Sequence, residues 1–105
     1  MADLEEKLAV FFQVLGNPLR LKILNLLREK KVMCVCELVE ILKREQSVVS
    51  RNLVALKQIG LLDCEPKATK SFYRIKDETV YKIIELASNI LEKRIKEEQK
   101  ILALI

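Results

Sequence analysis

Residues 34–60 read CVCELVEILKREQSVVSRNLVALKQIG. Two apolar patterns of helical period lie in this stretch, one over about residues 34–43 and one over about 46–59. In the second pattern Val49, Leu53 and Leu56 share one stripe at about 100° per residue, and Gly60 follows as a residue that commonly ends a helix. The stretch therefore predicts two short helices joined by a tight connection, the arrangement of a helix-turn-helix.

Further elements are predicted on both sides of this pair. Residues 3–15 form an amphipathic helix capped by Asp3, and Asn17-Pro18 begin a second, largely buried helix that gives way to a charged connection at 28–31. Beyond Gly60, residues 61–65 and 71–75 are β-prone and are separated by a basic tip at 66–70, which predicts a hairpin. From about residue 78 the chain returns to helix and stays helical to residue 105.

The composition agrees with this order of elements. A chain of 105 residues suits one domain, and two glycines, two prolines and 5% aromatic residues favour helices over a strand-rich fold. We therefore expect a mostly α fold with a small β-hairpin, a single winged helix-turn-helix domain over residues 1–105. Its helix-turn-helix spans about 34–60 and its wing about 61–76.

The polar face of the 46–59 helix has the chemistry of a DNA-reading surface. Once the apolar stripe is packed on the body, hydroxyl, amide and guanidinium groups point outward, where they suit phosphates and base edges. A formal net charge of +4 also favours a polyanionic partner. The alternative is an ordinary amphipathic helix that shows polar residues to water. The candidate residues for double-stranded DNA are Gln46, Ser47, Ser50, Arg51, Val54 and Gln58, with Lys67 and Lys70 at the wing tip.

The last helix predicts a second subunit. Its apolar stripe is longer than a chain of this size can cover from within, so we expect a homodimer formed by the helices at about 3–15 and 78–105. The two-fold axis would set the two reading helices about 34 Å apart, one turn of DNA. The candidate interface residues are Leu4, Leu8, Phe11, Ile83, Ala87 and Ile90.

Cys34 and Cys36 form a candidate metal site beside this surface. Thiolates select soft ions, and a position at a helix N-terminus favours the thiolate form. Residues two apart on a regular helix point about 200° away from each other, so one ion can bind both only if the first turn is irregular. Cys64 is the candidate third ligand, and the alternative for it is a small buried residue of a strand.

The sequence also indicates in which cellular compartment the protein is expected. Its acidic start lacks the pattern of a secretory leader, and no apolar run approaches the ~20 residues of a membrane span. We therefore expect a cytoplasmic protein without a membrane partner, whose thiols are free, metal-bound or redox-active.

Four segments together resemble the ArsR/SmtB family of winged-helix repressors over roughly residues 8–78. These segments are Leu15-Gly16-Asn17-Pro18-Leu19-Arg20-Leu21-Lys22-Ile23-Leu24, Cys34-Val35-Cys36-Glu37-Leu38, Gln46-Ser47-Val48-Val49-Ser50-Arg51-Asn52-Leu53 and Phe72-Tyr73-Arg74-Ile75. The resemblance implies a homodimer that binds operator DNA and releases it when a metal, a metalloid or, in some branches, a redox signal arrives. Asn52 stands where many relatives carry His, a departure that bears on operator preference.

Within that resemblance, the Cys34–Leu38 segment is similar to the thiol motif of the arsenite- and cadmium-sensing branch. The arsenite type often adds a third Cys where this chain has Val39, and the carboxylate-and-His zinc site of other members is excluded because the chain has no His. The expected function is therefore that of a sequence-specific transcriptional repressor, not an enzyme, relieved by As(III), Cd(II), Pb(II) or Zn(II), with no cofactor required for folding. The alternatives are a regulator that responds to thiol oxidation or to no inducer, and a small thiol metal carrier or oxidoreductase.

Overall fold

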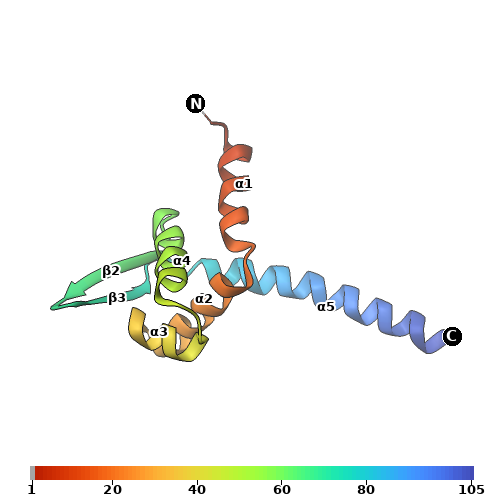
Figure 1. The fold of residues 1–105 in the computed structure, drawn as a ribbon. Helices are drawn as coiled ribbons and strands as arrows, with labels where there is room; N and C mark the ends of the chain where they lie inside the picture. The colour runs from red at the N-terminus through yellow and green to blue at the C-terminus, as the bar shows by residue number, and fades with distance from the viewer. Residues whose placement is uncertain (1) are drawn as a thin grey trace.

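The computed structural model describes residues 2–105, which form five helices and a three-stranded antiparallel sheet (Figure 1). The elements are α1 (Leu4–Leu15), α2 (Pro18–Lys30), β1 (Val32–Cys34), α3 (Val35–Leu42), α4 (Gln46–Gln58), β2 (Leu62–Lys67), β3 (Lys70–Ile75) and α5 (Val80–Leu104). The predicted class, mostly α with a small hairpin, is confirmed, with β1 as an added strand.

The helix ends follow the capping residues of the sequence. An Asp3 carboxylate oxygen accepts the N–H of Glu6 at 2.8 Å, and the Asn17 side-chain oxygen accepts the N–H groups of Leu19 and Arg20 at 2.9 and 3.2 Å. Gly60, just beyond α4, has φ +85°, a conformation that suits glycine. The predicted starts of α1 and α2 and the predicted end of α4 are therefore confirmed.

Two predicted boundaries were wrong. The charged residues at 28–30 continue α2 to Lys30 instead of forming a connection, and its basic residues lie in the last turn, where cations stabilise the helix dipole. The last helix begins at Val80 and not at 78. Before it, the Asp77 carboxylate accepts the N–H of Thr79 at 3.0 Å and holds a turn.

The sheet has the order β1-β3-β2, and its two outer strands both pair with β3. Met33 lies opposite Tyr73 in one pair, and Cys64 lies opposite Tyr73 in the other. The β2–β3 wing closes at Ala68-Thr69, between the facing residues Lys67 and Lys70. The sequence prediction missed β1 because three residues carry no measurable alternation, and its only partner lies some 40 residues away.

The core lies where α2, α3, α4 and the sheet meet. Its fully buried side chains include Ile23 and Leu24 of α2, Leu38 of α3 and Leu53 of α4. From α5, only Val80 and Tyr81 are buried. The remainder of α5 is therefore positioned by few contacts with its own chain.

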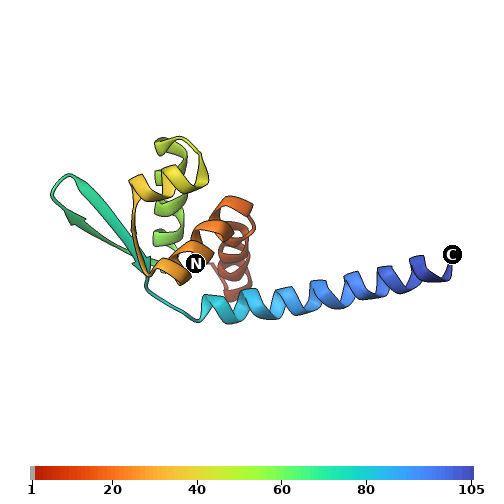
Figure 2. The same ribbon diagram turned by 90° about the horizontal axis from the view of Figure 1, so that it is seen from below.

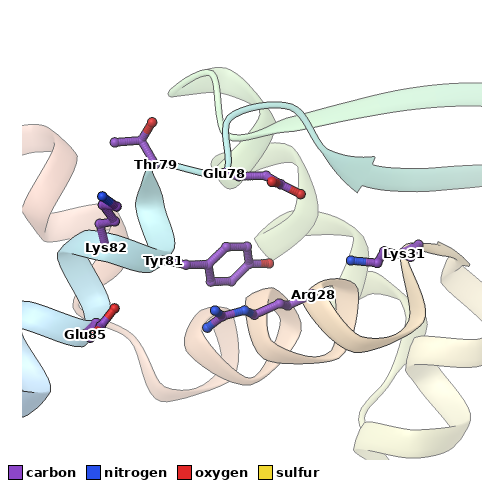
Figure 3. A pocket seen from close by; sticks show the side chains of 7 residues that line it. All are labelled: Arg28, Lys31, Glu78, Thr79, Tyr81, Lys82 and Glu85. Carbon is purple, nitrogen blue, oxygen red and sulfur yellow. The ribbon is translucent and has the colours of Figure 1, made fainter.

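Tyr81 fastens the start of α5 to α2. Its hydroxyl donates to the Leu24 carbonyl oxygen at 2.6 Å, and the Arg28 guanidinium carbon lies 4.7 Å from the ring centroid (Figure 3). This pairing of a buried hydrogen bond with a cation over an aromatic face fixes where α5 leaves the body.

We expect Tyr81→Phe to lower the free energy of unfolding by about 1–2 kcal/mol, because the buried Leu24 carbonyl loses its donor. Burial also raises the pKa of Tyr81 from 10.0 to about 12. The unfolded chain therefore loses this proton at a lower pH than the folded chain, and stability falls as pH rises through that interval. Urea unfolding at pH 7 and pH 11 checks both effects. Because Tyr73 shifts in the same direction, Tyr81→Phe should reduce the alkaline loss without removing it.

The wing and α5 project from the body in opposite directions (Figures 1 and 2). The molecule measures 60 × 40 × 22 Å along its principal axes. Among residues 2–105, no helix combines the length and the apolar character needed to cross a membrane.

Candidate DNA interface and thiol pair

The reading face of α4 has the predicted orientation. Val49, Leu53 and Leu56 are fully buried and fix the helix on the body. On the other side, all but one of the predicted DNA-contacting residues of α4 are exposed, namely Gln46, Ser47, Arg51, Val54 and Gln58. Ser50 is half-buried. The predicted wing residues Lys67 and Lys70 are exposed at the hairpin tip.

Asn52 turns toward the body and contacts α2. Its side-chain oxygen accepts from Arg20 Nε at 2.8 Å, and its side-chain nitrogen donates to the Val48 carbonyl oxygen at 2.8 Å. Arg20 also donates to the Val14 carbonyl oxygen at 3.2 Å. This network connects the end of α1 and the start of α2 to the middle of α4. Asn52 thus holds α4 against α2.

The first turn of α4 has unused donors. Glu45 occupies the N-cap position but makes no side-chain hydrogen bond there. The N-terminal N–H groups of a helix, together with its dipole, form a suitable environment for a phosphate. Sequence reasoning missed the exposed Lys43 and Arg44, which precede this turn in the α3–α4 connection. The sequence feature that could have identified them is the pair of adjacent basic residues directly before α4.

Cys34 is the N-cap of α3, outside the helix. Its backbone is extended, with φ −81° and ψ 161°, and its Sγ accepts the N–H of Glu37 at 3.3 Å. In return, the Glu37 carboxylate accepts the N–H of Cys34 at 3.0 Å. This is a reciprocal capping box with sulfur in the place of a hydroxyl oxygen.

This geometry brings the two sulfur atoms together. Cys36 lies in the first turn of α3, the two Cα atoms are 5.3 Å apart, and the two Sγ atoms are joined in a disulfide. The predicted difficulty of a 200° separation does not arise, because the helix begins one residue later than expected. The thiols, expected to be free, metal-bound or redox-active, are in the oxidised form here.

A hollow of about 200 Å³ joins the cysteine pair to the candidate DNA surface. Cys34 lines it from the end of β1 and Cys36 from α3, Gln46 and Ser50 line it from α4, and Lys70 lines it from the wing. Sequence reasoning missed its other polar lining residues, Thr69, Ser71 and Tyr73. One cavity therefore contains the thiol pair and residues of both predicted DNA-binding elements.

Cys64 lies apart from the pair. It belongs to β2, whereas Cys34 belongs to β1, and β3 lies between these strands, a separation of about 10 Å. Cys64 contacts Tyr73, whose pKa is raised to about 12 by burial and by hydrogen bonding to this thiol. In the described part of the chain, no three Cys, His, Asp or Glu side chains gather as metal ligands. The structure therefore does not assemble the predicted three-cysteine site within one chain.

A second hollow, of about 470 Å³, lies between the end of α2 and the start of α5 (Figure 3). Its charged lining is of both signs, with Arg28, Lys31 and Lys82 beside Glu78 and Glu85. None of the predicted DNA-binding or thiol residues reaches it. This hollow therefore offers less to an anionic partner than the α4 surface does.

The candidate dimer residues lie on surfaces that the chain itself leaves uncovered. Leu4, Leu8 and Ile90 are 68%, 44% and 69% exposed. Ala87 is also exposed, while Phe11 and Ile83 are half-buried against the core. An interface between copies at these residues stays a prediction.

Comparison with known proteins places the chain among transcriptional regulators. Residues 17–63 match the family described as bacterial regulatory protein, arsR family. An HTH-type transcriptional regulator of Methanocaldococcus jannaschii is 40% identical over 85 residues, which cover 81% of this chain and 96% of that protein. The arsenical resistance operon repressor of Bacillus subtilis is 35% identical over 79 residues, or 75% of each chain.

A solved structure supports the same assignment. The homodimeric winged helix-turn-helix DNA-binding domain (fragment 1–100) of a possible ArsR-family transcriptional regulator from Mycobacterium bovis superimposes with a TM-score of 0.73 at 28% identity, covering 89% of this chain and 92% of that one. The matched family segment includes α2, the thiol pair and all of α4. The chain therefore belongs to the ArsR family, and it is a DNA-binding transcriptional repressor with a winged helix-turn-helix fold, not an enzyme.

Proposed function

We propose that this repressor binds operator DNA as a homodimer in the cytoplasm and releases it when a thiophilic metal or metalloid binds Cys34 and Cys36. The observation that carries this proposal is the shared hollow, in which the sulfur pair meets Gln46 and Ser50 of α4 and Lys70 of the wing. A change at the sulfur atoms is therefore a change at the DNA surface.

The DNA half of the proposal follows from exposed chemistry. Arg51 and Gln46 reach outward from the reading helix, where guanidinium and amide groups recognise guanine and adenine edges in the major groove. Lys67 and Lys70 meet the flanking phosphates from the wing. The uncapped first turn of α4 adds N–H groups for a further phosphate.

We expect Lys67→Gln combined with Lys70→Gln to weaken duplex binding at every sequence. The salt slope of log K should fall by about 3.6, since the homodimer loses four phosphate contacts and each contact accounts for about 0.9. Fluorescence anisotropy from 50 to 300 mM KCl measures both quantities. Lys22→Gln combined with Lys30→Gln, two exposed residues of α2 outside the candidate DNA surface, is the matched control and should leave the slope unchanged. An unchanged slope in the wing variant would show that the wing does not contact the backbone.

The thiol half follows from the position of the pair. Its two convergent sulfurs suit a soft ion such as As(III), Cd(II), Pb(II) or Zn(II) in their reduced form. Such an ion, when bound, would hold both sulfurs and withdraw Cys34 from its cap on the Glu37 N–H. Because Leu38 of α3 is fully buried in the core that seats α4, a shift of this first turn is transmitted to the reading helix.

Further ligands complete the coordination of such an ion. Soft ions of this group usually take more than two ligands, and one chain supplies only the pair at close range. Cys64 reaches the ion only if the sheet edge moves or if it comes from the second subunit. The experiment below tests the role of Cys64 separately from the role of the Cys34–Cys36 pair.

Oxidation of the pair is the second candidate signal, and the disulfide itself favours it. Two thiols would lose two protons and two electrons to a peroxide, which is reduced to water as the sulfur–sulfur bond forms. Disulfides in reducing compartments are mostly transient and redox-sensing, so the observed pairing is compatible with a switch.

One titration tests these alternatives. A fluorescent duplex, selected by the protein from a random library, is titrated with reduced protein alone and then with As(III), Cd(II), Zn(II) or hydrogen peroxide. Release by an ion, lost in Cys34→Ser and Cys36→Ser, supports metal sensing, and loss also in Cys64→Ser assigns the third ligand. Release by peroxide alone supports the redox reading. Affinity unchanged by every addition would overturn the sensing proposal while leaving DNA binding intact.

A further inference from the structure

The hollow between the end of α2 and the start of α5 has two walls of different charge. Arg28 and Lys31 line it from the α2 side, and Glu78 and Glu85 line it from the α5 side (Figure 3). Lys82 adds one basic residue to the α5 side. A space lined in this way is complementary to a molecule that carries a negative group and a positive group.

The charges of the two walls do not neutralise one another. Among residues 2–105, neither of the two ion pairs joins a side chain of α2 to one of α5. The Tyr81 ring lies between the walls, and its hydroxyl is bound to the Leu24 carbonyl oxygen at 2.6 Å (Figure 3). The charged groups of the hollow are therefore available to a bound molecule.

Lys31 has a backbone conformation that is unfavourable for lysine. It directly follows α2 with φ +75° and ψ −58°, in the region that favours glycine. Strained conformations of this kind cost free energy and are concentrated at ligand-binding and active sites. Here the strained residue is one of those that place a positive charge at the hollow.

A smaller hollow, of about 200 Å³, continues the first one towards the sheet. The two linings have four residues in common, Arg28, Lys31, Glu78 and Tyr81. The smaller hollow is lined in addition by Arg74 and by the apolar residues Leu27, Val32 and Ile75. An apolar group of a ligand can therefore lie directly beside the charged walls.

An α-amino acid with an apolar side chain carries all the matching groups. Its carboxylate accepts hydrogen bonds from Arg28 and Lys31, and its ammonium donates to Glu78. Its side chain then occupies the smaller hollow. The main hollow, at about 470 Å³, has the size of a small-molecule pocket, typically about 300–1,000 Å³. A simple anion would use one wall only, and a polyanion would be repelled by the glutamates.

We propose that the α2–α5 hollow binds a free α-amino acid with an apolar side chain and that this ligand is a second input to the repressor, separate from the thiol pair. The ligand contacts α2 and the start of α5 together, at the point where Tyr81 fixes the direction in which α5 leaves the body. It therefore favours one angle between α5 and the body. The regulatory role rests on the homodimer of the proposed function, in which this angle affects the separation of the reading helices, whereas binding of the amino acid does not.

Isothermal titration calorimetry of the full chain tests the binding. Leucine, isoleucine, valine, methionine and phenylalanine are titrated one by one, and we expect saturable binding of at least one of them. For that amino acid, the N-acetyl derivative lacks the positive charge and the amide lacks the negative charge, so each should bind at least about tenfold more weakly. No saturable binding of any of the five up to about 10 mM overturns the site. Equal affinity for the amino acid and both derivatives overturns the two-wall mode of binding.

The Lys31→Gly variant tests the site with a change that should not harm the fold. Glycine accepts the positive φ, so the melting temperature without ligand should rise by a few degrees, while the affinity for the amino acid should fall about tenfold. Glu78→Gln should weaken binding from the other wall. Lys30→Gln is the matched control, because Lys30 is exposed in α2 but does not line the hollow. Unchanged amino-acid affinity in both Lys31→Gly and Glu78→Gln contradicts the site.

Operator affinity tests the regulatory role. It is measured in a chain with Cys34→Ser and Cys36→Ser, so that thiol chemistry does not contribute. A saturating concentration of the bound amino acid should change this affinity by about fivefold or more, and Lys31→Gly should remove the change. Binding without any change in operator affinity overturns the regulatory role and leaves the site standing. Absence of binding overturns both, whereas release of DNA by Cd(II) from the unmodified chain still supports the proposed function.

Discussion

Replacing Cys36 by serine is expected to abolish the response of operator affinity to Cd(II) and As(III). Operator affinity without these ions should stay within about twofold of the unmodified chain, since Cys36 is exposed and caps nothing. Loss of either sulfur leaves one soft ligand, which cannot hold the ion against buffer thiols. Anisotropy titration of the selected duplex, with and without each ion, measures the response.

The Cys34→Ser variant makes this test sharper. Serine is a preferred N-cap residue, so its hydroxyl oxygen can take over the hydrogen bond from the Glu37 N–H, and α3 should form as before. The variant therefore loses the sulfur without losing the cap. Cys64→Ser serves as the control for loss of a thiol elsewhere. A Cys34→Ser protein that still releases DNA on addition of Cd(II) would place the sensor outside the pair.

The second large effect is expected from Arg20→Ala. Arg20 donates to both Asn52 and the Val14 carbonyl oxygen, and its loss leaves those part-buried acceptors without their charged donor. We expect the free energy of unfolding to fall by about 1.5–3 kcal/mol, the range for hydrogen bonds to a charged group. Operator affinity should also fall, because α4 loses its lateral support. Urea denaturation and anisotropy measure these quantities on the same preparation.

Arg51→Ala is the matched control, since it removes the same side chain from the exposed face of α4. It should change stability by no more than about 0.5 kcal/mol and yet weaken duplex binding. Loss of Arg20 is thus expected to lower both stability and duplex affinity, because Arg20 supports the fold. Loss of Arg51 is expected to lower duplex affinity alone, because Arg51 is proposed to contact the DNA. Equal stability losses in the two variants would contradict the role given to the Arg20–Asn52 network.

Local signals made most of the fold predictable. Asp3, Asn17-Pro18 and Gly60 mark helix ends through their own backbone chemistry, and the Val49–Leu53–Leu56 stripe records which side of α4 is buried. β1 was beyond this kind of reasoning, because a three-residue strand exists only through its pairing with β3. The charged end of α2 was misassigned because charge favours solvent exposure, which a helix end satisfies as well as a loop does.

The exposure of the candidate DNA-binding residues was predictable, while the geometry of the thiol pair was not. The reading face was oriented correctly, because one apolar stripe determines it. The relation between Cys34 and Cys36 depended on whether the helix begins at residue 34 or 35, a difference of one residue that sequence patterns do not resolve. The inward turn of Asn52 was missed for a related reason, since its partner Arg20 is 32 residues away.

Because Cys34 Sγ caps α3, hydrogen exchange at the Glu37 amide depends on the position of this sulfur. While Cys34 Sγ accepts this hydrogen at 3.3 Å, its exchange with deuterated solvent is slowed, and any chemistry that turns the sulfur away releases it. The disulfide-bonded pair keeps this cap, so faster exchange of the Glu37 amide on addition of an ion would report, without DNA and without a label, that the ion has withdrawn Cys34 from it. Cys34 Sγ would thus both bind the ion and hold the first turn of α3.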